Sequence, residues 1–146
     1  RLVLCDAITW AQQKGAKRII DMATLTGACV AALGKNYTGA FTNSQAFLGK
    51  LETCSQKTGE KLWQLPIDED FHKQVRESSV ADMTNCVIGT GAGSSLAAAF
   101  LEEFVDEGVE WIHLDIAGSS DFSDGKPYMA KGATGVLVRT LGEMFR

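Results

Sequence analysis

Residues 111–120, with the sequence WIHLDIAGSS, place a histidine, an aspartate and two serines within one short stretch. A β-strand sends successive side chains to opposite faces of its sheet. One face of this stretch would carry Trp111, His113 and Asp115, and the other face would carry Ile112, Leu114 and Ile116. The apolar set predicts a strand buried in the core of the fold, and the polar set brings His113 close enough to touch Asp115.

This polar pair raises three possibilities: a catalytic triad, half of a metal site, or a hydrogen-bonded pair within a core strand. A hydrolase with a Ser-His-Asp triad needs its serine on a strained turn such as G-x-S-x-G. The segment AGSSDF, residues 117–122, does not supply that turn. We therefore favour the core strand, and the rest of the chain must show what this strand serves.

The composition limits the class of protein. The chain has 146 residues, of which 45% are hydrophobic, and a formal net charge of -4. This length is enough for one domain with a substantial core. The acidic balance and the lack of any lysine or arginine run argue against nucleic acid or an anionic membrane surface as the main partner. No stretch reaches the ~20 apolar residues of a membrane span, and the first residues lack the order of regions in a signal peptide, so we expect a cytoplasmic protein.

The apolar periodicity predicts alternating helices and strands, which is the rhythm of an α/β fold. Strands are expected at residues 17–23, 37–43, 61–66 and 111–116. Helices are expected at residues 4–11, 24–34, 44–58, 68–77, 96–105 and 137–145, and residues 78–95 form the longest irregular segment. We interpret residues 1–146 as a single domain. Because neither an initiator methionine nor a capping residue precedes Leu2, we expect this domain to be truncated at its N-terminal side.

Several patterns resemble binding motifs but have simpler explanations. The cysteines form no C-x-x-C motif and are expected to be reduced thiols: Cys5, Cys29, Cys54 and Cys86. The acidic cluster at 68–72 suits the first turn of a helix, where it complements the helix dipole. The glycines at 89–93 match a nucleotide-binding loop poorly, since no clear strand precedes them and the spacing is wrong. A second acidic group is expected to be a solvated helix face: Glu102, Glu103, Asp106, Glu107 and Glu110.

Seven blocks of sequence carry a resemblance to a known family. They are RLVLCDAITWA (1–11), DMATLTGA (21–28), GAFTN (39–43), VADMTN (80–85), AAAFLEEFV (97–105), WIHLDIAG (111–118) and KGATGVLVRTL (131–141). In this order and approximate spacing they resemble the catalytic domain of the cytosolic leucine aminopeptidase family. The resemblance covers essentially the whole chain. It implies the C-terminal portion of a mixed-sheet, three-layer α/β/α catalytic domain.

The resemblance also implies a chemistry. Members of this family remove N-terminal residues, leucine and similar ones, from peptides with two divalent metal ions, zinc or manganese. Two such ions can bind the free amino group, polarise the carbonyl and activate a water. The family's signature Asn-Thr-Asp-Ala-Glu-Gly-Arg would end at Arg1, so the metal ligands would precede this chain, which would be inactive alone. The complete protein is expected to be a homo-hexamer that binds a peptide substrate.

Individual site residues follow from the same resemblance. Arg1 matches the family's active-site arginine, which holds a bicarbonate ion as proton shuttle, and a guanidinium suits a planar oxyanion because it donates two parallel hydrogen bonds. Thr24, Leu25 and Gly27 match the strand-to-helix turn that approaches the substrate, with the Leu25 carbonyl facing the peptide backbone. Cys86, Ala117 and Ser120 match the pocket for the N-terminal side chain. His113 and Asp115 are then scaffold, because the strand delivers its C-terminal loop to that pocket.

A different reading keeps the fold without the chemistry. A regulatory or nucleic-acid-binding relative would retain the seven blocks while losing the metal ligands. The residues encoded immediately before Arg1 distinguish the two readings, because only the enzyme would carry the acidic signature there.

Overall fold

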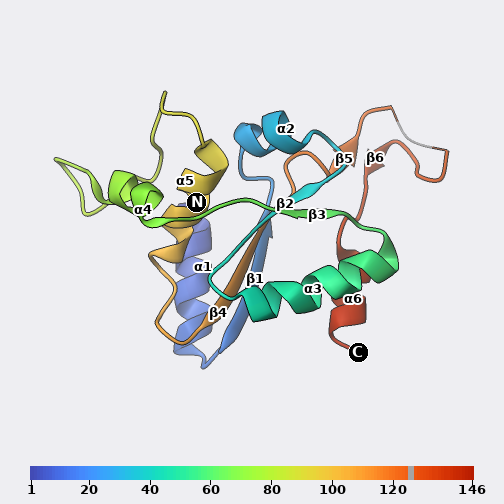
Figure 1. Ribbon diagram of the computed structural model, residues 1–146, viewed down its shortest axis with the longest axis horizontal. Helices are drawn as coiled ribbons and strands as arrows, with labels where there is room; N and C mark the ends of the chain where they lie inside the picture. The colour runs from blue at the N-terminus through green and yellow to red at the C-terminus, as the bar shows by residue number, and fades with distance from the viewer. Residues whose placement is uncertain (125–126) are drawn as a thin grey trace.

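The computed structural model describes residues 1–124 and 127–146, which form a four-stranded sheet with helices on both faces (Figure 1). The strands of this sheet are β1 (Arg18–Ala23), β2 (Thr38–Thr42), β3 (Leu62–Gln64) and β4 (Glu110–Asp115). The helices are α1 (Leu2–Gln13), α2 (Gly27–Leu33), α3 (Gln45–Thr58), α4 (Glu69–Arg76), α5 (Gly93–Glu102) and α6 (Val138–Met144). A separate short pair is formed by β5 (Asp121–Phe122) and β6 (Gly132–Ala133). The strands of the main sheet and the helices lie close to where the sequence predicts them, although α5 begins and ends three residues earlier than expected, and β5 and β6 were not expected.

The sheet has the strand order β1-β4-β2-β3 and is mixed. β4 runs parallel to β1 and antiparallel to β2, and β3 runs parallel to β2. The strand expected at residues 111–116, β4, therefore lies in the interior of the sheet with a partner on each side. Figure 1 shows α1 and α5 on one side of β1 and β4, and α3 and α6 on the other. The expected mixed-sheet, three-layer α/β/α architecture is confirmed.

Side chains of β4 alternate between two hydrophobic clusters, as the sequence predicts. Trp111 packs in the cluster formed with α1, α4 and α5, whereas Ile112 and Leu114 pack in the cluster formed with α3 and the start of α6. All three side chains are 0% exposed. Because complete burial of one such side chain contributes about 1.5–3 kcal/mol, this single strand is a main source of the cohesion between the layers.

The starts of α3 and α4 have side-chain caps that are readable in the sequence. Ser44 accepts a hydrogen bond from the backbone N–H of Phe47 at the start of α3. Asp68 accepts from the backbone N–H groups of Asp70 and Phe71 at the start of α4. The acidic cluster at 68–72 is thus a cap with acidic residues in the first turn, as expected, and such caps contribute about 0.5–2 kcal/mol each.

The second acidic group is only partly a solvated face. Asp106 and Glu107 are exposed, but Glu102 and Glu103 are half-buried beneath α4. The His72 ring contacts both carboxylates, with Nδ1 2.6 Å from Glu103 and Nε2 3.1 Å from Glu102. Burial opposes ionisation of Glu103, but hydrogen bonds from Arg76 and His72 outweigh this and hold its pKa below the ordinary value. The expectation is wrong for these two residues because α4 folds back over the end of α5. It is also wrong for Glu110, which is half-buried in β4 and bonded to Arg18 and Ser44.

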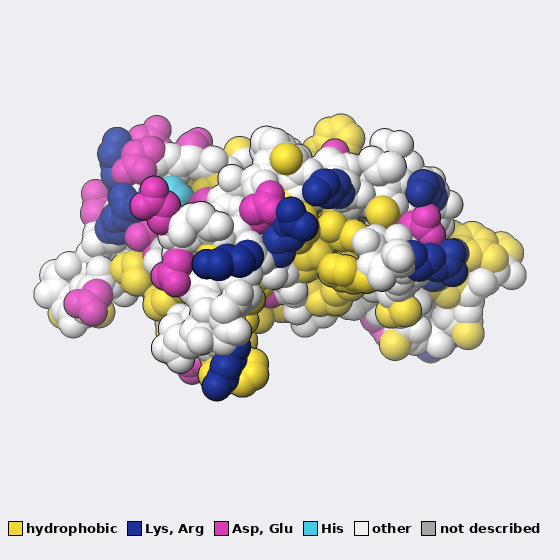
Figure 2. Space-filling model, turned by 90° about the horizontal axis from the view of Figure 1, so that it is seen from below, with side chains coloured by type: hydrophobic (Ala, Val, Ile, Leu, Met, Phe, Trp, Pro, Cys, Tyr) yellow, Lys and Arg dark blue, Asp and Glu magenta, His cyan; other side chains and the backbone are white. Residues whose placement is uncertain are grey.

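The border of the sheet at β1 exposes apolar side chains. In the part of the chain that the structure describes, β1 has a strand partner on one side, namely β4. Val3 and Trp10 of α1 are 80% and 62% exposed, and Phe145 after α6 is 73% exposed. The view from below shows an apolar area beside Lys and Arg side chains (Figure 2).

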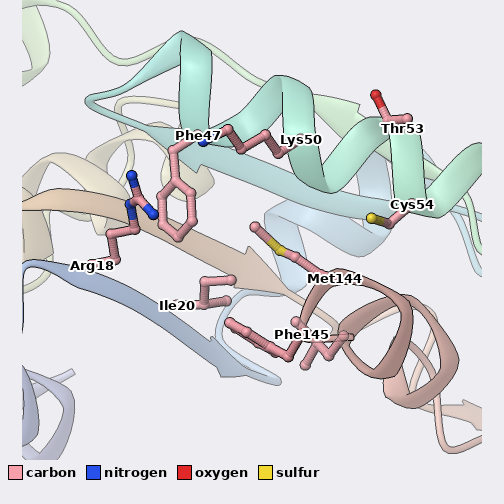
Figure 3. A pocket seen from close by; sticks show the side chains of 9 residues that line it. Arg18, Ile20, Phe47, Lys50, Thr53, Cys54, Met144 and Phe145 are labelled. Carbon is pink, nitrogen blue, oxygen red and sulfur yellow. The ribbon is translucent and has the colours of Figure 1, made fainter.

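A groove of about 640 Å³ lies between β1, α3 and α6. Figure 3 shows its lining, in which Ile20, Phe47, Met144 and Phe145 supply an apolar surface. Arg18 and Lys50 stand among the same lining residues and bring positive charge to it. The groove therefore continues the apolar border of β1 onto the α3 and α6 face of the sheet. Across the described ranges, no helix is long and apolar enough to cross a membrane.

A first prediction concerns Gly118, which lies in the loop after β4. A Cβ atom at this position would lie 2.0 Å from the carbonyl oxygen of Gly34, at the end of α2. Because backbone must move to admit it, Gly118→Ala should lower the free energy of unfolding by about 3 kcal/mol. Gly142 in α6 is the matched control, since a Cβ atom there would meet nothing within 4 Å and alanine favours helices. Urea denaturation should show Gly142→Ala unchanged or stabilised; equal effects of both substitutions would contradict the close approach.

A second prediction concerns cysteine reactivity. Burial raises the pKa of the Cys5 and Cys29 thiols to about 11, so both are protonated at neutral pH. Cys86 is exposed, and Cys54 is intermediate. Iodoacetamide should modify Cys86 first and should reach Cys5 and Cys29 only after unfolding, because the thiolate is the reacting form. Peptide mass spectrometry over time checks the order, and modification of Cys29 as fast as Cys86 would contradict it.

Candidate functional site

Two loops that carry predicted site residues meet at one edge of the sheet. β1 and β4 are parallel neighbours, with Ala23 opposite Asp115 at their C-terminal ends. The turn at residues 24–27 leaves β1 at this edge, and the loop at residues 116–120 leaves β4 beside it. Figure 1 shows α2 and the N-terminus toward the same end of the molecule. Crevices at the C-terminal ends of strands are common binding positions in open α/β sheets.

The carboxyl group of Asp115 joins these two loops. Its Oδ1 accepts hydrogen bonds from the backbone N–H of Leu25 at 3.1 Å, of Thr26 at 3.5 Å and of Ala117 at 3.1 Å. Its Oδ2 accepts from the Thr26 hydroxyl at 2.6 Å. The side chain is almost completely buried, with Asp115 1% exposed. The turn after β1 and the loop after β4 are therefore fixed to each other through one carboxylate.

Thr26 extends this network to a third segment. Its Oγ1 caps α2 by accepting from the backbone N–H of Cys29 at 3.1 Å. The same oxygen lies 2.9 Å from the Ser94 hydroxyl in the first turn of α5. Both Thr26 and Ser94 are buried. Thr26 therefore joins the start of α5, which follows the long irregular segment, to the turn at 24–27.

The loop after β4 is held by its own backbone and by Thr38 and Thr134. The backbone N–H groups of Ser119 and Ser120 both donate to the carbonyl of Ile116, at 3.1 and 3.0 Å. The Ser119 and Thr38 hydroxyls lie 2.8 Å apart, and the backbone N–H of Thr134 donates to the Ser120 carbonyl at 2.9 Å. Ala117 and Ser120 are half-buried within this loop.

Arg1 and Cys86 belong to a neighbouring group. Arg1 precedes α1, and its guanidinium donates a hydrogen bond to the carbonyl of Asn85. This contact brings Arg1 beside the segment that carries Cys86, whose side chain is exposed. No hydrogen bond within the described residues joins Arg1 to the turn at 24–27. The predicted site residues thus lie in two groups: Thr24, Leu25, Gly27, Ala117 and Ser120 around Asp115, and Arg1 with Cys86.

His113 and Asp115 share a face of β4 but have separate partners. His113 Nδ1 lies 2.6 Å from a carboxylate oxygen of Asp21 on β1, and the indole N–H of Trp111 donates to the other oxygen at 2.6 Å. The His113 ring is 1% exposed and stacks between Phe41 and Trp111, with centroids 5.9 and 6.2 Å away. Its Nε2 is buried and has no hydrogen-bond partner among the described residues. The histidine is a core residue in this arrangement.

Sequence reasoning did not find the parts played by Asp21, Thr26 and Ser94. Asp21 lies directly opposite His113 in the β1 and β4 register, which becomes visible only when the strand order is known. Thr26 carries a signal, since a threonine before a run of small apolar residues is a typical helix cap. Ser94 carries none, because its partner lies far away in the sequence.

The residues present do not fit a metal centre. In the described ranges, no group of three or more His, Cys, Asp or Glu side chains is arranged to hold a metal ion. The two carboxylates nearest the candidate site are already engaged, Asp21 by His113 and Trp111 and Asp115 by the two loops. Any metal ion at this site would need ligands from outside these residues.

Comparisons with solved structures agree with the fold. A structure of a mutant of tomato leucine aminopeptidase superposes with a TM-score of 0.89 at 41% sequence identity, covering 98% of this chain and 27% of that chain. The likeness thus includes the β1 turn and the β4 loop described above.

Comparisons of sequence give the same family. A Solibacter usitatus protein named probable cytosol aminopeptidase is 44% identical to this chain, over 99% of this chain and 29% of the relative. Proteins of the same name from Bacillus subtilis and Alkaliphilus oremlandii are 45% and 48% identical, over 99% and 97% of this chain. The chain spans 28% of the length of each of the latter two. The profile described as "Cytosol aminopeptidase family, catalytic domain" matches residues 1–142, and the chain therefore belongs to the cytosol aminopeptidase family.

Proposed function

We propose that residues 1–146 are the C-terminal part of the catalytic domain of an aminopeptidase that removes N-terminal residues, leucine and similar ones, from peptides. The observation that carries this proposal is the joining of the Leu25 turn to the Ala117 loop through Asp115, in a chain of this family. A peptide site at a sheet edge needs backbone acceptors close to the residues that contact the side chain, and the carboxylate of Asp115 holds the Leu25 turn beside the loop of Ala117.

Two divalent metal ions, zinc or manganese, are part of the proposal for the whole protein. When bound, such a pair binds the peptide's amino group, polarises its carbonyl and activates water. Their ligands would lie outside residues 1–146, because the nearby carboxylates of this chain are used in structural hydrogen bonds. This chain alone would then be inactive.

The residues of this chain would bind and orient the peptide. The Leu25 carbonyl would accept a hydrogen bond from a peptide N–H, while Thr24 and Gly27 shape the same turn. Cys86, Ala117 and Ser120 would contact the N-terminal side chain. Arg1 would hold an oxyanion such as bicarbonate, since only one of its N–H groups is used by the Asn85 carbonyl and the fork retains further donors. The role of Arg1 would be to hold such an anion where it could supply proton transfer.

The proposal also includes the cellular location and the assembly of the complete protein. The relatives are named cytosol aminopeptidases, which supports a cytoplasmic protein. A homo-hexamer is proposed for the complete protein. Cooperative assembly would also cover apolar surface of the kind exposed by Val3, Trp10 and Phe145.

The third prediction tests Arg1 in the full-length protein that contains this chain. Arg1→Ala should lower kcat for a leucyl substrate by about 10²–10⁴, the usual contribution of general acid–base assistance. Arg1→Lys should recover only part of the rate, because an ammonium lacks the planar fork. Metal content, measured by atomic emission, should stay the same, since arginine is not a cation ligand. A fully active Arg1→Ala enzyme would contradict the assigned role.

His113→Gln is the control for that experiment. Loss of the bond to Asp21 should lower the free energy of unfolding by about 1–3 kcal/mol while kcat stays near normal. A folded but inactive His113→Gln protein, paired with an active Arg1→Ala protein, would move the chemistry to β4. Sequencing the codons before Arg1 provides the matching test of the non-catalytic alternative.

The fourth prediction concerns metal binding by residues 1–146 alone. Calorimetric titration with zinc should show no stoichiometric site tighter than about 1 μM, which corresponds to about -8 kcal/mol. The full-length protein should bind two equivalents. A tight site in residues 1–146 would show that metal ligands lie within this chain, contrary to the proposal.

A further inference from the structure

The burial of Asp115 is not explained by an ionic partner. Its side chain is 1% exposed, and no salt bridge to it is found within residues 1–124 and 127–146. A buried carboxylate without a cation is costly unless hydrogen-bond donors surround it. Here the donors are the backbone N–H groups of Leu25, Thr26 and Ala117 and the Thr26 hydroxyl. The buried carboxylate of Asp115 therefore orders backbone, namely that of the turn at 24–27 and of the loop after β4.

The direction of the hydrogen bonds fixes the direction of two carbonyl groups. A trans peptide unit is planar, so its C=O points away from its own N–H. The described chain contains no cis peptide bond. Because the N–H groups of Leu25 and Thr26 both point at Asp115, the carbonyls of Thr24 and Leu25 in the same peptide units point away from it. No backbone hydrogen bond to either oxygen is found in the described ranges, so both are available as acceptors.

The hydroxyl relay keeps the carboxylate from rotating. Thr26 Oγ1 donates to Asp115 Oδ2 and accepts from the Cys29 N–H, so its remaining lone pair receives the Ser94 hydroxyl proton. Every donor and acceptor of the Thr26 hydroxyl is thereby used. The relay ties the carboxylate to the starts of α2 and α5, which are both buried at this point.

We infer that Asp115 is a positioning residue for the peptide site: through its contacts with the turn at 24–27 and the loop after β4, it directs the Thr24 and Leu25 carbonyls toward the N–H groups of the substrate. This inference rests on the proposed function, and it assigns to Asp115 a role beyond the scaffold of the sheet. The carboxylate does not touch the substrate; it acts through the peptide units that it orients.

The test compares substitutions of two aspartates, Asp115 and Asp21, in the full-length protein. Asp115→Ala should raise KM for a leucyl peptide about tenfold or more, with a smaller change in kcat, since acceptors for the bound substrate lose their direction. Asp115→Asn should recover most of the affinity, because an amide oxygen can still accept the backbone N–H groups. Asp21→Ala is the matched control: it removes a hydrogen-bonded carboxylate, 11% exposed, from the same sheet face but from no loop of the site, and KM should stay normal.

Hydrogen exchange supplies a readout that does not need activity. Asp115→Ala should speed exchange in segments 24–27 and 116–120, whereas Asp21→Ala should leave both protected. A cooperatively folded Asp115→Ala protein with unchanged KM and unchanged exchange would overturn the inference.

If Asp115→Ala does not fold, the Thr26→Val variant decides, because it removes the shortest hydrogen bond to Asp115. A raised KM supports the inference, and an unchanged KM rejects it. An inactive wild-type protein would instead reject the proposed function, and the exchange data would still decide whether Asp115 holds the loops.

Discussion

A carboxylate buried between the ends of two parallel strands is the interaction on which this structure depends. Asp115 is the last residue of β4, and its carboxylate accepts backbone hydrogen bonds from the turn after β1 and from the loop after β4. Backbone N–H groups that are removed from water must be paired, and here one buried N–H, that of Thr26, and two half-buried ones, those of Leu25 and Ala117, share one side chain. Hydrogen bonds between a single charge and fixed peptide dipoles thus hold the two loops of this edge together.

One part of β4 is buried in the core, and another part, its C-terminal end, lies at the candidate site. Two residues before Asp115, His113 contacts the rings of Phe41 and Trp111, and its Nδ1 is hydrogen-bonded to Asp21 inside the sheet. On the opposite face, Ile112 and Leu114 are fully buried against α3 and α6. The body of β4 is therefore buried on both faces and its end is polar. A binding site keeps its geometry best when it is held on such packed elements.

Local structure was largely predictable because its causes are local. The alternation in β4 and the caps at Ser44 and Asp68 depend on neighbouring residues, and the structure agrees with them. Contacts across the fold were not predictable in the same way. His113 was expected to touch Asp115, two residues away, but it pairs with Asp21, which the parallel register places opposite it.

The acidic residues after α5 show a related limit. Glu102 and Glu103 look like a solvated surface in the sequence, and only the fold of α4 over α5 places His72 and Arg76 against them. The grouping of Leu25 with Ala117 could be anticipated from the family resemblance, whereas the carboxylate that joins them could not. Polar partners distant in sequence leave no periodic signal, since periodicity reports only which face a residue occupies.

The border of the sheet at β1 has a consequence for what can pack against it. In the described residues β1 has one strand partner, β4, and a strand edge is a template onto which a further strand can add. Charges that oppose such addition lie at one end of β1, at Lys17 and Arg18, while Met22 near the other end is apolar and 36% exposed. A strand of any origin would therefore meet charge at the start of β1 and apolar surface at its end, beside the loops of the candidate site.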